Sequence, residues 1–372
     1  PVSRGPGAAW ALAAALLAAC AAGAQVTLRD GSVVESPVTE VSAAGVAVAT
    51  DPPATITWDR VLRVDGEHAA DAERYAEMAD DLWRARTRLA RGDVSLSAPI
   101  FEAWFARDDG PTGATRLVVA EGLLVCRLAR LAQVASVEPW LEALRLRRAL
   151  GGPIEPGFPS ALDPATGLAP ALAPVWLDGP AVEAFAVTPI EPTGDDLVDA
   201  LAAMLRESAA IETGAPVVGR AATAIDHDGA RLVRAMIDAI SGVPAVRERA
   251  RTILRSGLSR DEGTWREAWR RAALGRSLLL ESDLESRDAG LVHLAHLPAR
   301  FTRSQPYLAG VALALMADEF ARRGDHAAAG ALRADLAGLA DSHPARAWLA
   351  GRRRVGAPDA TRDPTAADSD PR

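Results

Sequence analysis

The stretch FARRGDHAAAGALRADLAGLADSHPARAWL, residues Phe320–Leu349, decides the fold class of this chain. Alanine and leucine recur at helical spacing on both sides of Gly324-Asp325, and His343-Pro344 breaks the pattern near the end. Glycine readily adopts the left-handed backbone conformation that commonly ends a helix. The stretch therefore predicts two helices whose direction reverses at Gly324, with a proline closing the second one.

The same kind of turn occurs far upstream, in RLARGDVSLSAPIFEAWF, residues Arg88–Phe105. Each turn glycine is followed by a small residue five positions later and an apolar residue eight positions later: Ser97 and Ile100 in the first copy, Ala329 and Leu332 in the second. Small residues at such a contact let two antiparallel helices approach closely. This order resembles the helix hairpin of tetratricopeptide (TPR) repeats.

The resemblance implies an α-solenoid of antiparallel helix hairpins, a fold with extended surfaces for binding other proteins. The first copy departs from the family because it lacks the early W-x-x-L-G pattern, and no regular period of about 34 residues links the copies. We therefore expect a mainly α chain with a degenerate, TPR-like α-solenoid. The composition agrees, since alanine, leucine and arginine dominate and are strong helix formers.

Two features of the composition exclude particular mechanisms. The sequence contains neither lysine nor asparagine, so arginine supplies all 41 of its strongly basic side chains. Without lysine there is no Walker-type phosphate-binding lysine, no Schiff-base lysine and no S-x-x-K nucleophile. The formal net charge of −8 argues against non-specific binding of nucleic acid, which needs a basic surface.

Residues 1–24 predict a secretory signal peptide. Arg4 precedes an apolar run over residues 8–19, which is too short for a stable membrane span. The small residues Ala22-Gly23-Ala24 fit ordinary signal-peptidase cleavage, whereas Leu17-Ala18-Ala19-Cys20 resembles the lipobox of bacterial lipoproteins. We expect an exported protein, periplasmic or secreted; the alternative is a membrane-anchored lipoprotein acylated at Cys20.

Residues 25–66 predict a small β module. Valine and threonine alternate with polar residues, and turn signals at Asp30-Gly31, Ala44-Gly45 and Asp51-Pro52-Pro53 separate about five short strands. The pattern resembles the small Sm-like barrels that follow signal peptides in exported bacterial proteins. Such a module would serve either as a docking surface or as a cap on the first helix pair.

The remainder is predicted to be helical, with one interruption. We expect helical hairpins in residues 67–150 and the TPR-like α-solenoid in residues 195–351. Residues 151–194 are rich in proline and glycine, which predicts an ordered arm or linker at a domain boundary. Residues 352–372 are charged and rich in proline, and we expect this tail to be disordered.

Short motifs offer candidate chemistry, but local structure explains them better. Arg91-Gly92-Asp93 and Arg323-Gly324-Asp325 match the cell-adhesion tripeptide, yet both lie on predicted hairpin turns. Asp226-His227-Asp228 would orient a base for a serine such as Ser208, but the chain has no G-x-S-x-G motif. We therefore interpret Asp228 as the N-cap of the following helix.

A metal site is the next candidate. His293 and His296 share one face of a predicted helix, and acidic residues upstream would complete a zinc ligand set: Glu281, Asp283, Glu285 and Asp288. The acids lie across a helix break, and the chain has no H-E-x-x-H motif. We interpret the histidines as core residues and the acids as a solvated helix end, and predict no metal or other cofactor.

Tryptophan is frequent, with nine residues in the chain. In TWREAWRR, Trp265 and Trp269 are one helical turn apart and are flanked by Arg266 and Arg270. Packing between helices explains such tryptophans, but tryptophan and arginine also anchor bound peptides. These four residues are the candidate protein-binding residues of the sequence.

The sequence thus predicts an exported, non-catalytic scaffold or adaptor that binds other envelope proteins through an α-solenoid surface. Two alternatives stay open: a cell-envelope enzyme such as a glycan hydrolase, and a lipoprotein component of an envelope assembly complex. A hydrolase needs two opposed carboxylates, whereas Glu281 and Glu285 are one turn apart. Nucleic acid is not an expected partner, and membrane contact is expected only with lipidation at Cys20.

Overall fold

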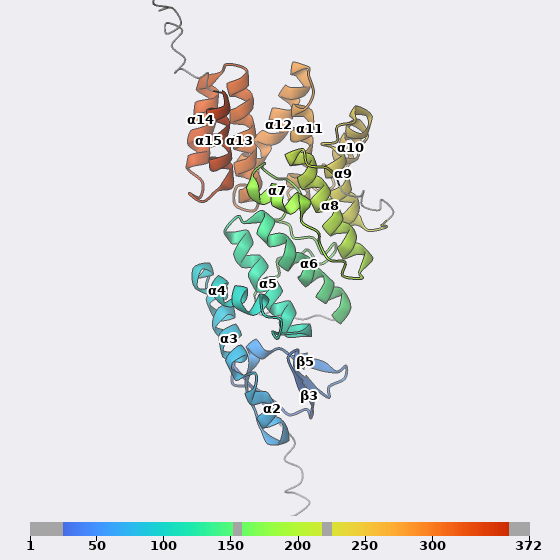
Figure 1. Cartoon of the computed structure of the whole chain (residues 1–372), viewed down its shortest axis with the longest axis vertical. Coiled ribbons are helices and arrows are strands. Elements are labelled where there is room, and N and C mark those ends of the chain that lie inside the picture. Colours follow the sequence, from blue (N-terminus) through green and yellow to red (C-terminus); the bar gives the residue numbers. More distant parts are fainter. Residues whose placement is uncertain (1–24, 152–157, 218–224, 357–372) are drawn as a thin grey trace, which may run out of the picture. The chain divides into compact units, whose positions relative to one another are not determined.

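The computed structural model describes residues 25–151, 158–217 and 225–356, with side chains up to Arg352. The predicted signal peptide with Cys20, and residues 357–372 of the predicted tail, lie outside this part. The described residues divide into two compact units, the first within residues 1–129 and 135–161 and the second within residues 130–134 and 162–372. Helices dominate the described residues of both units, which confirms the mainly α prediction (Figure 1).

Six short strands open the first unit: β1 Val26–Leu28, β2 Val33–Val34, β3 Val38–Ser42, β4 Gly45–Val48, β5 Ala54–Ile56 and β6 Val61–Val64. They form two antiparallel sheets, one in the order β2-β1-β6 and the other in the order β3-β4-β5. Because no described strand pairs across the two sheets, the described residues contain no closed barrel. The predicted Sm-like barrel is therefore wrong, although the position of the β region is correct.

Fourteen α-helices follow in the described residues. Five precede the proline-rich segment: α2 Ala69–Glu73, α3 Ala76–Ala90, α4 Val94–Phe105, α5 Gly113–Ala129 and α6 Gln133–Leu150. The others lie within or after it: α7 Pro180–Val187, α8 Asp196–Thr213, α9 Asp228–Asp238, α10 Pro244–Ser256, α11 Trp265–Leu279, α12 Leu284–Arg300, α13 Pro306–Arg322, α14 His326–Ala337 and α15 Pro344–Gly356. Helix α15 thus extends into the segment predicted to be a disordered tail.

Trp58 joins the strands to the helices of the first unit. It is only 1% exposed, its indole Nε1 donates to the Ser42 carbonyl (2.8 Å), and its ring stacks on Tyr75. The hydroxyl of Thr115 in α5 accepts from the Trp58 N–H and donates to the Ala44 carbonyl. Strands and helices therefore share one core in this unit.

The two hairpin turns predicted from the sequence have nearly the same geometry. Gly92 and Gly324 adopt φ of 80° and 81°, in the left-handed region that favours glycine. The aspartate after each glycine caps the next helix, since its carboxylate accepts a backbone N–H three residues later. The small residues Ser97 and Ala329 are completely buried, as the predicted close helix contact requires.

Successive helices of the second unit pack against each other, from α7 with α8 through to α13 with α14. Residues 162–194, the part of the proline-rich segment that belongs to this unit, lie against these helices and supply carbonyl acceptors to their side chains. Ser208 donates to Pro174, Trp269 to Pro170 and Tyr307 to Val175. Trp176 in the same segment is 1% exposed. Side-chain donors thus order a segment whose prolines cannot form a regular backbone ladder.

Candidate functional site

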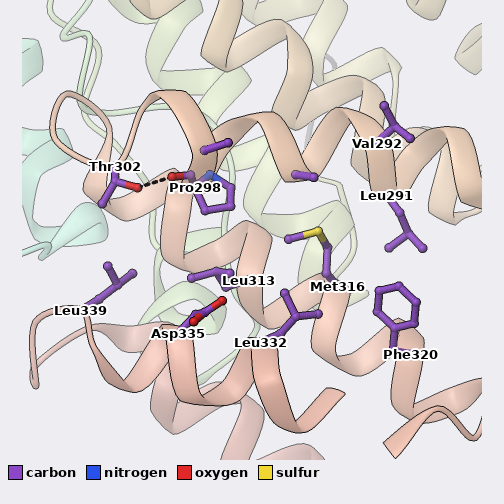
Figure 2. A pocket seen from close by; sticks show the side chains of 12 residues that line it. Leu291, Val292, Pro298, Thr302, Leu313, Met316, Phe320, Leu332, Asp335 and Leu339 are labelled. Carbon is purple, nitrogen blue, oxygen red and sulfur yellow. Dashed lines mark hydrogen bonds between the residues drawn. The ribbon is translucent and has the colours of Figure 1, made fainter. Parts of the chain in front are cut away.

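An open apolar groove of about 650 Å³ lies between α12, α13 and α14 of the second unit (Figure 2). One face of each helix lines it, with contacts at seven-residue intervals: Val292 and Ala299 on α12, Leu313 and Phe320 on α13, and Leu332 and Leu339 on and just after α14. Seven residues are about two helical turns, so the pair on α12 and the pair on α13 each lie on one face of their helix. The groove therefore has two apolar walls and an apolar floor.

The groove combines a buried floor with a solvent-exposed lip. Leu313 and Met316 on the floor are each 4% exposed, whereas Val292 on the α12 wall is 60% exposed. The groove thus combines an exposed aliphatic side chain with a concave apolar surface, a combination common in binding grooves. Sequence reasoning missed this site, although the apolar spacing from Leu313 to Phe320 lies directly before the quoted hairpin turn.

Two polar residues line the groove, and they differ in how well they are satisfied. The Thr302 hydroxyl donates to the Pro298 carbonyl (2.6 Å), which Figure 2 draws as a dashed line. Asp335 is exposed, and its carboxylate has no ion-pair or hydrogen-bond partner among the described residues. It lies between Leu332 and Leu339 in Figure 2. The groove therefore carries one uncompensated negative charge in an apolar lining.

Close helix contacts hold both walls of the groove in place. Helices α11 and α12 approach so closely that a Cβ added to Gly275 would lie 3.0 Å from the Gly290 carbonyl oxygen. On the other side, Ala329 of α14 is completely buried, and α14 packs against α13. Helices α12 and α14 are thus held by contacts outside the groove, and their groove-lining side chains do not take part in these contacts.

The tryptophans and arginines selected from the sequence have mainly structural contacts. Trp269 is 1% exposed, and buried Arg270 pairs with Asp261 (2.6 Å). Neither side chain is available to a partner in this conformation. Trp265 and Arg266 are half-buried: the Trp265 ring packs edge-on against Trp269, and Arg266 pairs with Asp163 (3.1 Å). A protein-binding role for Trp265, Arg266, Trp269 and Arg270 stays a prediction.

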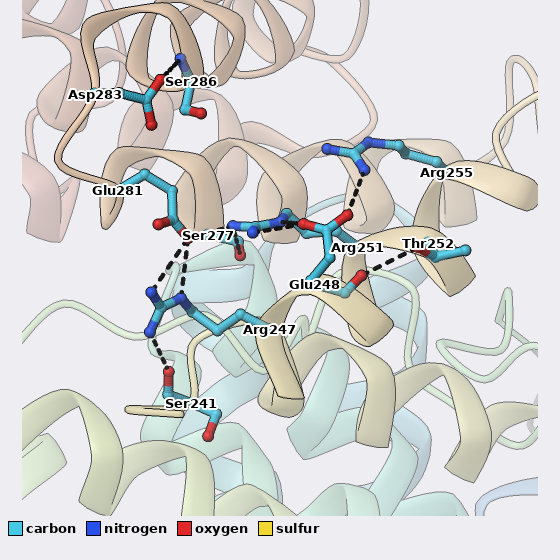
Figure 3. Close-up of polar contacts among 10 residues, drawn as sticks. All are labelled: Ser241, Arg247, Glu248, Arg251, Thr252, Arg255, Ser277, Glu281, Asp283 and Ser286. Carbon is cyan, nitrogen blue, oxygen red and sulfur yellow. Dashed lines mark hydrogen bonds and ion pairs between the residues drawn. The ribbon is translucent and has the colours of Figure 1, made fainter. Parts of the chain in front are cut away.

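Two of the acidic residues considered as metal ligands, Glu281 and Asp283, have partners within the chain (Figure 3). Glu281 pairs with Arg247 (3.2 Å) and Arg251 (2.6 Å) from α10. Hydrogen bonds from Arg251 and Arg247 hold the pKa of Glu281 below its ordinary value. Asp283 caps α12 by accepting from the Ser286 N–H. No group of three or more His, Cys, Asp or Glu side chains in the described residues could hold a metal ion.

His293 is a half-buried residue of α12. Burial is the main cause that lowers its pKa to about 4, and the nearby cations Arg271 and Arg255 add to the effect. Its Nδ1 is buried and has no hydrogen-bond partner in the described part of the chain. The pKa of His296 is also lowered, chiefly by burial.

The Asp-His-Asp motif forms a helix start, but with a different cap from the predicted one. His227 is the N-cap of α9, and its Nδ1 accepts from the Ala230 N–H (3.3 Å). The expected N-cap, Asp228, is the first helical residue and pairs with Arg231. Ser208 is fully buried and donates to the Pro174 carbonyl. The structure therefore does not bring the motif and this serine together as a catalytic group.

Comparisons with known proteins do not identify a relative. No protein-family model matches the sequence, and neither the curated proteins nor the solved structures contain a significant match. None of the helices in the described ranges has the length and apolar character required to cross a membrane. The groove is consequently the feature on which a functional proposal rests.

Proposed function

We propose that this protein is an exported, non-catalytic scaffold or adaptor of the bacterial cell envelope, built as a degenerate TPR-like α-solenoid. Its binding site is the groove between α12, α13 and α14. The sequence of residues 1–24 supports export, and the successive packing of α7 to α14 supports the solenoid. The observation that carries the binding role is the open apolar groove itself.

The exposed lip explains why a protein segment is a suitable occupant. A partner that covers Val292, Phe320 and Leu332 removes apolar surface from water, which is the main driving force of protein association. The length of the groove along three helices also suits a segment of polypeptide. Recognition would then depend on shape and apolar contact, with no chemical step.

Photo-crosslinking in the living cell tests this proposal. A photoreactive amino acid replaces exposed Val292 in the full-length protein, and the matched control replaces Val187, which is 57% exposed at the end of α7. We expect one dominant envelope protein to crosslink at position 292 and not at position 187. The same partner should crosslink from position 295 and be lost when Val292→Glu is added. Identical products at positions 187 and 292, or no protein product at 292 and 295, would contradict the proposal.

A further inference from the structure

We infer that the partner segment is an amphipathic α-helix of two to three turns that carries a basic residue beside its apolar stripe. This inference rests on the proposed function, because it describes the occupant of the same groove. It is carried by the secondary structure of the lining, by the length of the groove and by the charge of Asp335.

The lining selects a helix over an extended strand. All the backbone around the groove belongs to helices or their ends, so it offers no row of free N–H and C=O groups to an incoming strand. The hydroxyl of Thr302 is already bonded to Pro298. An extended segment would therefore leave its own backbone groups unsatisfied against apolar side chains, whereas a helix satisfies them internally.

The length follows from the spacing of the lining residues. Val292 and Ala299, and likewise Leu313 and Phe320, are seven residues apart. At a rise of about 1.5 Å per residue, each interval spans roughly 10 Å, or about two turns. A helix with apolar residues at i, i+4 and i+7 places three side chains over the same distance.

The charge of the groove then determines which charged residue the partner helix should carry beside its apolar stripe. Asp335 is its one charged lining residue, and no described cation compensates it. A partner bearing glutamate at this place would bring two negative charges together as water is excluded. A partner bearing arginine or lysine would form an ion pair, which gives specificity and orientation to a mainly apolar contact.

A panel of labelled peptides binding to the full-length protein tests the inference by fluorescence anisotropy. The reference peptide has about 14 residues, enough for almost four turns, with leucines at i, i+4 and i+7 on an alanine and glutamine background. Arginines border the leucine stripe on both sides, so the result does not depend on the direction of binding. One matched peptide replaces these arginines by glutamates, and another places its leucines at i, i+2 and i+4.

We expect the arginine peptide to bind roughly tenfold more tightly than the glutamate peptide, and the altered spacing to abolish binding. Asp335→Arg should reverse the charge preference. Glu191→Arg is the control, because it changes the net charge equally at an exposed loop residue of the same unit. This control therefore removes general attraction to an acidic protein as an explanation.

Two results would overturn the inference. One is a charge preference that Asp335→Arg and Glu191→Arg change alike, and the other is equal binding of the peptide with altered leucine spacing. If these results accompany a partner crosslinked at position 292, the scaffold proposal stands and only the class of partner is wrong. If position 292 yields no partner and no peptide binds, both proposals fail.

Discussion

Single residues decide how closely the helices of this protein pack. Gly310 in α13 faces the buried ring of His343, and a Cβ added there would lie 2.2 Å from the ring Nε2. That ring also contacts the Pro306 carbonyl and stacks on Tyr307, so it has little freedom to move. Gly330 in α14 faces open space. The two glycines have the same local conformation but opposite surroundings.

Alanine at these two positions should therefore shift stability in opposite directions. Gly310→Ala overpacks the contact with His343 and should lower the free energy of unfolding by about 1–3 kcal/mol. Gly330→Ala should raise it by about 0.5–1 kcal/mol, because alanine is the better helix former. Urea unfolding followed by circular dichroism measures both. A stabilising effect of Gly310→Ala would show that the space between Gly310 and the His343 ring can accommodate a methyl group.

The sequence predicts such residue roles only where one pattern decides them. The glycines of the two hairpin turns were predicted correctly because few residues adopt a left-handed backbone. The N-cap of α9 was predicted wrongly. Aspartates at 226 and 228 flank His227, and all three positions are compatible with a helix start. The contact of Gly310 with His343 joins residues that are distant in the sequence, so no local pattern reveals it.

Between elements, buried carboxylates join neighbouring helices. Glu319 of α13 is completely buried and pairs with Arg287 of α12 and with Arg323. Burial alone would raise the pKa of Glu319, but hydrogen bonds from these two arginines hold it below its ordinary value. The ion pair thus fixes α12 and α13, two of the helices that form the groove.

Breaking this buried pair should cost much more than breaking the more exposed pair beside it, Asp318 with Arg322. Glu319→Gln removes the charge partner of Arg287 and one of the two charge partners of Arg323, and should destabilise the protein by about 3 kcal/mol. Asp318→Asn, one residue earlier, removes a weak surface pair with Arg322 and should cost less than about 1 kcal/mol. Thermal unfolding of the two variants makes the comparison. Equal losses would mean that Glu319 does not hold α12 and α13 together.

The helices themselves were predictable from periodicity, but the groove was not. Leu313, Met316 and Phe320 have the spacing of any core-facing helix, and the sequence does not show that one part of this face has no covering helix. The same limit explains the error over the β module. Its alternation identified strands, whereas strand partners depend on pairing between segments that are far apart.

At the scale of the whole molecule, the many internal ion pairs and the histidines with lowered pKa values link stability to pH. Carboxylates with lowered pKa values, such as Glu281 and Glu319, stabilise the fold above their unfolded pKa of about 4.5. This stabilisation is lost as the pH falls through their folded pKa values. Asp59 acts in the opposite direction, because burial raises its pKa and its protonation on acidification favours the folded state.

His293 should cause a separate loss of stability on acidification, which begins at a higher pH than the loss caused by the carboxylates. Its pKa is about 4 in the folded state, against 6.5 for an ordinary histidine, so the unfolded chain binds the proton first. The stability that depends on neutral His293 is therefore complete above pH 6.5 and decreases between pH 6.5 and 4. Melting temperatures measured across this range should fall before the carboxylates begin to titrate.

Replacing His293 by leucine isolates this contribution, because leucine fills a similar volume and does not bind a proton. We expect the melting temperature of His293→Leu to fall less between pH 6.5 and 4.5 than that of the parent protein. His326→Gln, at the exposed start of α14, is the control and should keep the parental slope. If His293→Leu and the parent lose stability in parallel, the early loss arises elsewhere. If only His293→Leu has a flatter dependence of melting temperature on pH, the packing of α12, which forms a wall of the groove, is what disfavours protonation of His293.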